Sequence, residues 1–513
     1  MKVQLKNLGV WVLLGLVFNA CSVSVNPLVL VDASKAGDAA KSEDTKARDE
    51  SGAEPGASDE TAGDAVADEG EGDDDDGGGS EDDVVAAAGQ LEASSRLRFD
   101  PEGTGGTRQA TFLVDGDDLY AAWAEANASA VYQLRVAKRN INQSGWTQLV
   151  TDPTAGLNYN SAKSVSGMRI QLLKHDGRLM VAWNERYDSY DRLHVKAYAD
   201  QGGGTYAWVN ADNGSATGVN VSLVDSMRML EHQGKVYVAY QGHNGSRNNT
   251  RVAVFNDDWD SPAWVRVDGG VGNVNATLNQ SGSQNAFSQM AASDGDHLIV
   301  AWAEYNGSKF VARAKVYNND DANPAWTYIT VPNGNGIFGY STSYDMSGID
   351  IVPVGGKFYF SWLEGTNLVY ERFRMGVYDP EEDEFSYIGA DDGGGGTLPL
   401  KTYAKASSWT RMFVIEDRIY LTYATTVSVD VGGAPTDVVK APAWVYDPAD
   451  ASQLPWELSP AESVYYEDAE ALASVHGSFF KWGDDIFFSW NSRGTPWDIA
   501  IEKVSEDIER VEP

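Results

Sequence analysis

Residues 176–185 read DGRLMVAWNE, and a version of this phrase returns seven times along the chain. Each copy has a turn, an alternating apolar run and then an aromatic residue, which a glutamate follows two positions later in four copies. The key aromatics are spaced 60, 57, 62, 60, 61 and 67 residues apart; they are Trp123, Trp183, Tyr240, Trp302, Trp362, Tyr423 and Trp490. A near-constant period of this length is typical of one supersecondary unit copied around or along an axis.

One unit contains about four runs that look like half-buried strands. In the second unit they are Arg169–Lys174, Arg178–Trp183, Arg192–Tyr198 and Tyr206–Val209. These runs alternate in polarity or are rich in β-branched and aromatic residues, and a Trp usually stands in the fourth one. Four antiparallel strands per repeat and seven repeats predict an all-β fold, a seven-bladed β-propeller over residues 95–513.

The ring needs a strand that closes its last blade, and two segments could supply it. One is Ser95–Phe99, before the first unit, and the other is Ile508–Val511, near the C-terminus. The residues do not decide between them. Only Ser459–Val475 suggests a helix, because Ser459, Pro460 and Glu462 are typical of a helix start.

The N-terminus has the features of an export signal. Lys2 and Lys6 precede an apolar run, Leu8–Phe18, and the small residue Ala20 stands before Cys21. Cys21 is the only cysteine, so no disulfide can form within the chain. We interpret 1–20 as a signal peptide, and the alternative is an ordinary cleaved signal with an incidental cysteine.

The sequence Phe18-Asn19-Ala20-Cys21 resembles a bacterial lipobox, with Phe where Leu is usual. The resemblance implies that Cys21 carries fatty acyl chains such as palmitate, and two or more chains would anchor the protein stably. Ser22, rather than Asp, follows the cysteine, which under the best-known sorting rule implies the outer membrane. We therefore expect a lipid-anchored protein of the cell envelope that faces the periplasm or the exterior.

Residues 21–94 form an acidic tether. The stretch Ser22–Ser94 has 21 acidic and 4 basic residues and no aromatic one, and it accounts for −17 of the net charge of −36. Such a composition cannot bury enough apolar surface to fold, so we predict a disordered stalk. A strongly acidic chain without a basic stripe is repelled by nucleic acid, which we exclude as a partner. We expect a monomer.

The innermost strand of each blade lines the channel of a propeller. Counting back from each key aromatic to the start of that strand gives Gln109, Arg169, Arg228, Gln289, Asp350, Arg411 and Ser478. Arginine forks match the paired oxygens of carboxylates. We therefore predict a ligand site at the channel mouth, made by Arg169, Arg228, Arg411, Asp350, Gln289 and Gln109.

Long loops enter this same face, and several open with a phrase such as Gly156-Leu157-Asn158, Gly218-Val219-Asn220 or Gly272-Asn273-Val274-Asn275. The other face receives mostly tight turns. The glutamates that follow the key aromatics lie on the loop-rich rim as well; they are Glu125, Glu185, Glu304 and Glu364. Because they recur in most blades, we interpret them as structural.

The repeat resembles exported bacterial propellers built from "VAW-x-E … RVA … W" units, seen here in Val181-Ala182-Trp183-Asn184-Glu185 followed by Trp208. It covers about Arg108 to Glu502, and such rings are distantly similar to sialidase-type and kelch-type propellers. The resemblance implies the fold and export. The Ser-x-Asp-x-Gly-x-x-Trp boxes of sialidases are absent, and no privileged carboxylate pair or zinc-type histidine spacing is present, so we predict no metal and no cofactor.

Three functions remain. The preferred one is a non-catalytic binding module that recognises an external protein or an anionic glycan on its loop-rich face. The second is a glycan-processing enzyme, sialidase-like, in the propeller channel. The third is a structural scaffold of an envelope complex. The asymmetric distribution of arginines and long loops favours the first, and the question of catalysis stays open at this point.

Overall fold

The computed structural model describes residues 95–97 and 106–504, with gaps at 151, 153–154, 167–169, 188–189, 215–217, 220–223, 244–246, 270–276, 333, 335, 340–342, 367–368, 390–400, 432–433, 441–442, 451–454, 458–464, 467–476 and 493–497. The predicted signal peptide, Cys21, the acidic tether and Ile508–Val511 lie outside the described residues. So does Arg169.

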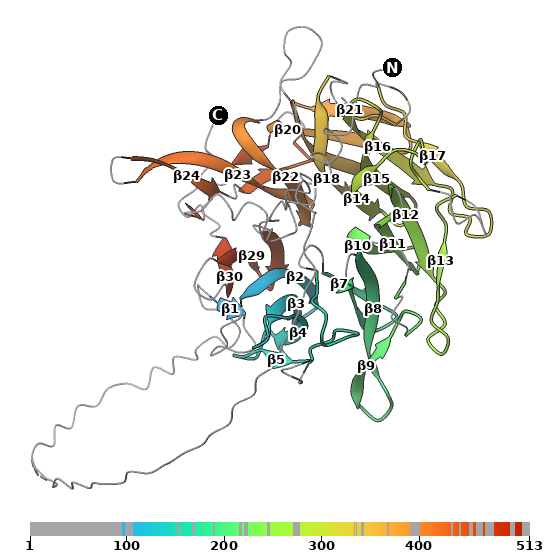
Figure 1. The fold of residues 1–513 in the computed structure, drawn as a ribbon, viewed down its shortest axis with the longest axis vertical. Helices are drawn as coiled ribbons and strands as arrows, with labels where there is room; N and C mark the ends of the chain where they lie inside the picture. The colour runs from blue at the N-terminus through green and yellow to red at the C-terminus, as the bar shows by residue number, and fades with distance from the viewer. Residues whose placement is uncertain are drawn as a thin grey trace, which may run out of the picture. The chain divides into compact units, whose positions relative to one another are not determined.

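The described strands form the seven blades that the repeat predicts (Figure 1). Blade 1 contains β2 (Thr107–Asp115), β3 (Asp118–Ala126), β4 (Tyr132–Asn140) and β5 (Thr147–Gln148). Blade 2 contains β6 (Gln171–His175), β7 (Arg178–Tyr187), β8 (Tyr190–Asp200) and β9 (Tyr206–Asn210). Blade 3 contains β10 (Val224–His232), β11 (Lys235–His243), β12 (Asn248–Phe255) and β13 (Trp264–Arg266). Blade 4 contains β14 (Ala286–Ser293), β15 (Leu298–Tyr305), β16 (Phe310–Tyr317) and β17 (Trp326–Tyr328).

The remaining blades follow the same antiparallel order with local additions. Blade 5 contains β18 (Asp345–Val354), β19 (Lys357–Thr366), β20 (Val369–Asp379) and β21 (Glu384–Ile388). Blade 6 contains β22 (Lys401–Ile415), β23 (Arg418–Val431), β25 (Ala443–Tyr446) and β26 (Trp456–Glu457). Blade 7 contains β28 (Ser478–Trp482), β29 (Asp485–Ser492), β30 (Asp498–Val504) and β1 (Ser95–Leu97). The all-β, seven-bladed propeller is thereby confirmed.

The hydrophobic core lies between successive blades. Trp183 packs in one cluster with residues of blades 1 and 2, and Trp362 packs in one cluster with residues of blades 4 and 5. In each of the six clusters the key aromatic faces the preceding blade. Because each sheet is apolar on both faces, one blade alone cannot bury its surface, and a ring of neighbours can.

A tryptophan in the fourth strand ties each of three blades to the blade before it. The indole Nε1 of Trp208 donates to the Leu149 carbonyl at 2.9 Å, that of Trp264 to the Ala211 carbonyl at 2.8 Å. The indole of Trp326 donates in the same way to the Val267 carbonyl at 2.7 Å. The recurrent fourth-strand Trp is therefore a structural clasp between blades.

The structure decides how the ring closes. Strand β1 pairs antiparallel with β30, with Ser95 opposite Ile501 and Leu97 opposite Ile499. The final blade is thus built from both ends of the ring, β28, β29 and β30 from the C-terminal side and β1 from the N-terminal side (Figure 1). Of the two predicted candidates, Ser95–Phe99 supplies the closing strand.

Blade 6 departs from the repeat. Its second strand, β23, extends beyond the blade and pairs with β24 (Ala434–Lys440), which in turn pairs with β27 (Tyr465–Tyr466), and these strands form the protruding arm in Figure 1. The helix predicted within Ser459–Val475 is wrong at Tyr465 and Tyr466, which form a strand. The reason is tertiary, since the edge of β24 offers these two residues a partner.

Side chains at the tight-turn face connect neighbouring blades. Asp115 pairs with Lys174 at 2.8 Å between blades 1 and 2, and Glu416 pairs with Lys481 between blades 6 and 7. His232 of β10 contacts Ser293 Oγ of β14 at 2.9 Å through Nδ1, and Asn319 Oδ1 at 2.8 Å through Nε2. Burial lowers the pKa of the His232 imidazole, although Asn319 opposes the shift.

We predict that stability falls with pH through this histidine. The unfolded chain takes up a proton near the ordinary pKa of about 6.5, while folded His232 resists it, so unfolding becomes easier below that pH. Urea unfolding at a series of pH values checks this. His232→Gln, whose amide can still donate to Asn319, should flatten the profile, and His297→Gln, changed at a more exposed site, should not. Identical profiles in all three proteins would contradict the prediction.

Candidate functional site in the channel

The strand register shows which residues occupy equivalent places on the seven inner strands. In every blade one inner-strand residue lies opposite the residue just before the key aromatic. These residues are Thr111, Gln171, Arg228, Met290, Asp350, Arg411 and Ser478. The predicted channel positions are therefore correct for Arg228, Asp350, Arg411 and Ser478.

The other three predicted positions are out of register. Gln109 and Gln289 stand before the equivalent residues Thr111 and Met290, and Arg169 stands before Gln171. In blades 1 and 4 the register shifts just there, between Arg108 and Thr111 and between Phe287 and Met290. A β-bulge adds residues to one strand only, so counting along the chain across it goes astray.

The structure gives the two glutamines internal positions. Gln289 is fully buried; it accepts a hydrogen bond from Ser226 Oγ at 2.5 Å and donates to Thr250 Oγ1 at 3.3 Å, which links blades 3 and 4. Gln109 is buried with a backbone φ of 39°, and its amide nitrogen and oxygen have no hydrogen-bond partner. Neither side chain is placed as an exposed ligand contact.

Arg228, Asp350 and Arg411 converge at one level of the channel from three different blades. Asp350 is 1% exposed and accepts hydrogen bonds from the backbone N–H of Ile351 and of Met412, both at 2.8 Å. Because Met412 belongs to the next blade, the carboxylate braces blades 5 and 6. It also stabilises the charge of its neighbour Arg411.

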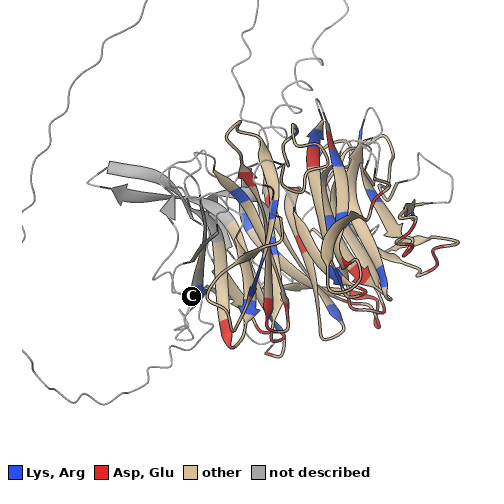
Figure 2. Cartoon of the chain, turned by 90° about the horizontal axis from the view of Figure 1, so that it is seen from below, with Lys and Arg blue, Asp and Glu red and all other residues tan. Residues whose placement is uncertain are grey.

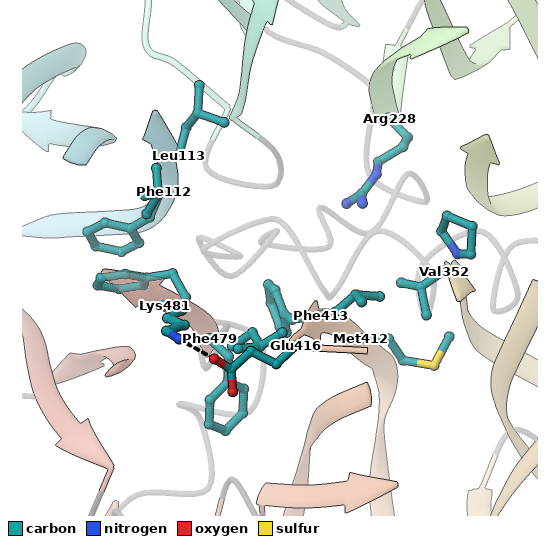
Figure 3. Close-up of a pocket in the computed structure, with 14 residues that line it drawn as sticks. Phe112, Leu113, Arg228, Val352, Met412, Phe413, Glu416, Phe479 and Lys481 are labelled. Carbon is teal, nitrogen blue, oxygen red and sulfur yellow. Dashed lines mark hydrogen bonds and ion pairs between the residues drawn. The ribbon is translucent and has the colours of Figure 1, made fainter. Parts of the chain in front are cut away.

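Two guanidiniums share this part of the channel. Burial lowers the pKa of Arg411, Asp350 opposes that shift, and the like charge of Arg228 adds to it. Arg411 thus has a nearby counter-ion. Among the described residues no hydrogen bond or ion pair engages the guanidinium of Arg228, which reaches into the channel (Figure 3). A site with two cations and one committed carboxylate has spare positive charge for an anion.

The glutamates of the repeat are structural, as predicted. Each accepts a hydrogen bond from the indole of the key tryptophan two residues earlier, at distances from 2.8 to 3.2 Å; the pairs are Trp123–Glu125, Trp183–Glu185, Trp302–Glu304 and Trp362–Glu364. All four glutamates are buried. Buried carboxylates require such partners, and these have them.

Two of these glutamates also hold the long loops. Glu185 accepts the backbone N–H groups of Tyr159 and Asn160, both at 2.8 Å. Glu304 accepts those of Gln280 at 2.9 Å and Ser281 at 3.1 Å. The loops that cover this face are therefore fixed to the blade cores.

An asparagine fixes each of these loops a second time. Asn158 Oδ1 accepts the Leu134 N–H at 2.8 Å, and Asn279 Oδ1 accepts the Thr250 N–H at 2.9 Å. The structural counterpart of Asn158 is thus Asn279, which follows Leu278 as Asn158 follows Leu157. The expected match with Gly272–Asn275 misses this, and those four residues lie outside the described part.

Sequence reasoning missed a set of buried arginines on the third strands. Arg313 lies opposite Trp302, and Arg374 lies opposite Trp362. Arg374 Nε donates to Glu364 at 2.9 Å, and Arg313 Nε is 3.6 Å from Glu304. The "RVA" part of the repeat was the available signal, because it places an arginine at this position. These charges neutralise the glutamates and belong to the core.

The loop-rich face carries aromatic rings with arginines stacked on them. Arg108 lies over Tyr132 at 4.1 Å and Arg192 over Tyr187 at 4.7 Å. Arg372 lies over Tyr344 at 4.1 Å. Such pairs hold a planar cation against an aromatic face, so they present flat, polar-edged surfaces next to the channel.

A cavity of about 500 Å³ occupies the tight-turn half of the channel (Figure 3). Most of its wall is apolar, and the residues that line it are Phe112, Leu113, Val114, Arg228, Val352, Pro353, Met412, Phe413, Val414, Ile415, Glu416, Phe479, Phe480 and Lys481. Glu416 and Lys481 form an ion pair, so Arg228 is the lining charge without a described partner. The volume is in the range of small-molecule sites.

Acidic and basic residues are interspersed over the described ring (Figure 2). The described residues hold no cluster of three or more His, Cys, Asp or Glu side chains that could bind a metal ion. Within the same residues no helix is long and apolar enough to span a membrane.

Comparison with known proteins finds similarity at the level of the fold. No family model matches the chain, and no curated protein resembles it in sequence. The ring is similar to a phage phi92 endosialidase (10% identity, 82% of this chain and 70% of that one, TM-score 0.40). It is also similar to an α-L-arabinofuranosidase from Fusarium graminearum (14%, 68% and 95%, 0.38) and to an α-L-arabinanase from Penicillium chrysogenum (14%, 68% and 98%, 0.35).

The preferred functional prediction, a non-catalytic binding module on the loop-rich face, is corrected here. The solved rings that resemble this one are named as enzymes of carbohydrate chemistry. The contact residues are also misplaced in it, because Asp350 is buried in mid-channel and the cavity that Arg228 lines lies towards the tight turns. What stands is the fold: the chain is a seven-bladed β-propeller similar to sialidase-type rings.

We predict that Glu304→Ala destabilises the ring by about 3–5 kcal/mol, because it leaves the Trp302 indole, two loop N–H groups and buried Arg313 without their acceptor. Glu304→Gln keeps one acceptor oxygen and should cost less. Urea unfolding measures the free energies, and hydrogen exchange of Gln280 and Ser281 reports the loop. Glu382→Ala, at an exposed turn, is the control. An unchanged exchange rate in Glu304→Ala would contradict the anchoring role.

Proposed function

We propose that the ring is a glycan-processing enzyme that acts on sugar chains carrying carboxylates, with the reacting sugar bound in the channel. One observation carries the proposal: Arg228 and Arg411 meet at one level of the channel, and only Arg411 has a described counter-ion. A carboxylate is the natural partner for the remaining positive charge, because its two oxygens match the fork of a guanidinium.

The loop-rich face supports a sugar chain as the rest of the ligand. Tyr132, Tyr187 and Tyr344 present partly exposed rings around the channel entrance, each with an arginine on one face. Aromatic faces with a few polar groups are typical linings of small-molecule sites. Because Glu185 and Glu304 fix the loops, this surface is organised before a ligand arrives, which lowers the entropy lost on binding.

Asp350 acts on the reaction through Arg411. Its oxygens accept two backbone N–H groups, and its charge stabilises the charged form of Arg411, so we assign it as a positioning residue. The two guanidiniums would then neutralise the carboxylate of the sugar and stabilise negative charge that develops beside it in the transition state. The glutamates of the repeat take no part, since the tryptophans and loops already use them.

We predict that Arg228→Met lowers kcat/KM for a carboxylated glycan by about a hundred-fold, as loss of one preorganised donor does. The assay follows release of reducing ends from polysialic acid and from polygalacturonic acid. Asp350→Asn should lower turnover less than Arg228→Met and should be accompanied by a weaker response to Arg411→Met. Arg418→Met, an exposed arginine outside the cavity, is the control.

The result that would overturn the proposal is equally direct. If neither polymer nor its oligosaccharides are turned over by the wild-type protein, the ring is not an enzyme of this class. If turnover occurs and Arg228→Met and Arg418→Met behave alike, the chemistry lies elsewhere in the ring.

The place of the protein in the cell is also a proposal. The signal at 1–20, Cys21 and the acidic residues 21–94 support a lipid-anchored ring held off the outer membrane by a stalk. We predict that Cys21→Ser moves the protein from the membrane fraction to the soluble fraction of its native host or of a lipoprotein-processing bacterium. Retention of the variant in the membrane fraction would contradict the anchor.

A further inference from the structure

The walls of the channel cavity differ from the polar lining that a sugar alone requires. Phe112 stacks on Phe480 with ring centroids 4.6 Å apart, and Phe413 meets Phe479 edge-on at 6.0 Å. Val414 is 40% exposed although it lines a concave site. Apolar side chains that face solvent in a cavity favour an apolar occupant, because its entry releases the water against them.

The charges of the cavity are placed at its two ends. Glu416 and Lys481 neutralise each other next to the tight turns. Arg228 approaches from the opposite side, and Figure 3 shows its guanidinium directed towards the apolar wall that blades 1, 6 and 7 contribute. An occupant that satisfies both features is apolar along its length and anionic at the end next to Arg228.

We propose that the cavity binds an alkyl or aryl group whose attached carboxylate pairs with Arg228, so that the ligand of this channel is amphiphilic. With the proposed function, on which this identification of the substrate rests, the substrate is a carboxylated sugar with an apolar aglycone or acyl group. The sugar then lies towards the loops, and the apolar group lies between the inner strands of blades 1, 5, 6 and 7.

The size of the cavity fits such a group. A volume of about 500 Å³ accommodates a medium-length alkyl chain or an aromatic ring with part of its linker, within the usual range of small-molecule sites. The walls come from inner strands rather than loops, so the site is rigid and preformed. Rigid sites discriminate by shape, and binding should therefore depend on chain length as well as on charge.

Calorimetric titration of the full-length protein with decanoate, below its micellar concentration, tests the proposal. Decanol and glucuronate are the matched probes that lack the charge and the apolar chain, respectively. We expect decanoate to bind at least about ten-fold more tightly than either, because an ionic hydrogen bond and chain burial each contribute on that scale.

Two variants locate the ligand. Arg228→Met should weaken decanoate by about ten-fold or more and leave decanol unchanged. Val414→Asp places a negative charge on the apolar wall at a partly exposed position and should weaken decanoate and decanol together. Arg418→Met should bind all three probes like the wild type. Thermal unfolding of each variant confirms that the ring is folded.

The outcomes separate this inference from the proposed function. Tight glucuronate binding with turnover of carboxylated glycans, but no decanoate binding, would overturn the apolar site and leave the enzyme proposal standing. Decanoate binding that both Arg228→Met and Val414→Asp abolish, without turnover of any glycan, would support the apolar site and remove the enzyme. Decanoate binding that is the same in all variants would place the ligand elsewhere and overturn the inference.

Discussion

The ring depends on the hydrogen bond from a buried indole to a buried glutamate. In blades 1, 2, 4 and 5 the key tryptophan packs against the preceding blade, and its Nε1 donates to the carboxylate two residues later. The same carboxylate, in Glu185 and Glu304, receives two N–H groups of a long loop. One side chain thus connects the inter-blade core to the functional face, and buried arginines such as Arg374 offset its charge.

This arrangement explains why most charged residues near the channel are unavailable to a ligand. Glu364, Glu304, Arg313 and Arg374 are used within single blades, and Asp350 braces two blades through the Met412 N–H. The charge that remains is that of Arg228. In a propeller the inner strands all reach one channel, so a single unpaired cation there governs which ligands can enter. Its contact with an apolar cavity on one side and a polar rim on the other makes an amphiphilic anion the best chemical match.

Much of the candidate site could be read from the repeat, and its errors have one cause. Arg228, Asp350 and Arg411 were placed correctly because the hairpin between the first two strands has the same register in every blade. Gln109 and Gln289 were misplaced because bulges near the strand starts change the count. The cavity could not be predicted at all, since Phe112, Val352, Phe413 and Phe480 are far apart in the chain and look like ordinary strand residues.

The sequence by itself determined the seven-bladed ring, because a period near 60 residues with four alternating runs allows no other way to bury both faces of each sheet. Only the tertiary structure decided the closing strand, the partners of the glutamates and the chemistry of the channel. These depend on contacts between residues from different blades, such as Ser95 with Ile501 or Asp350 with Met412. Local pattern specifies which face of a strand is buried, but ring closure alone specifies what that face meets.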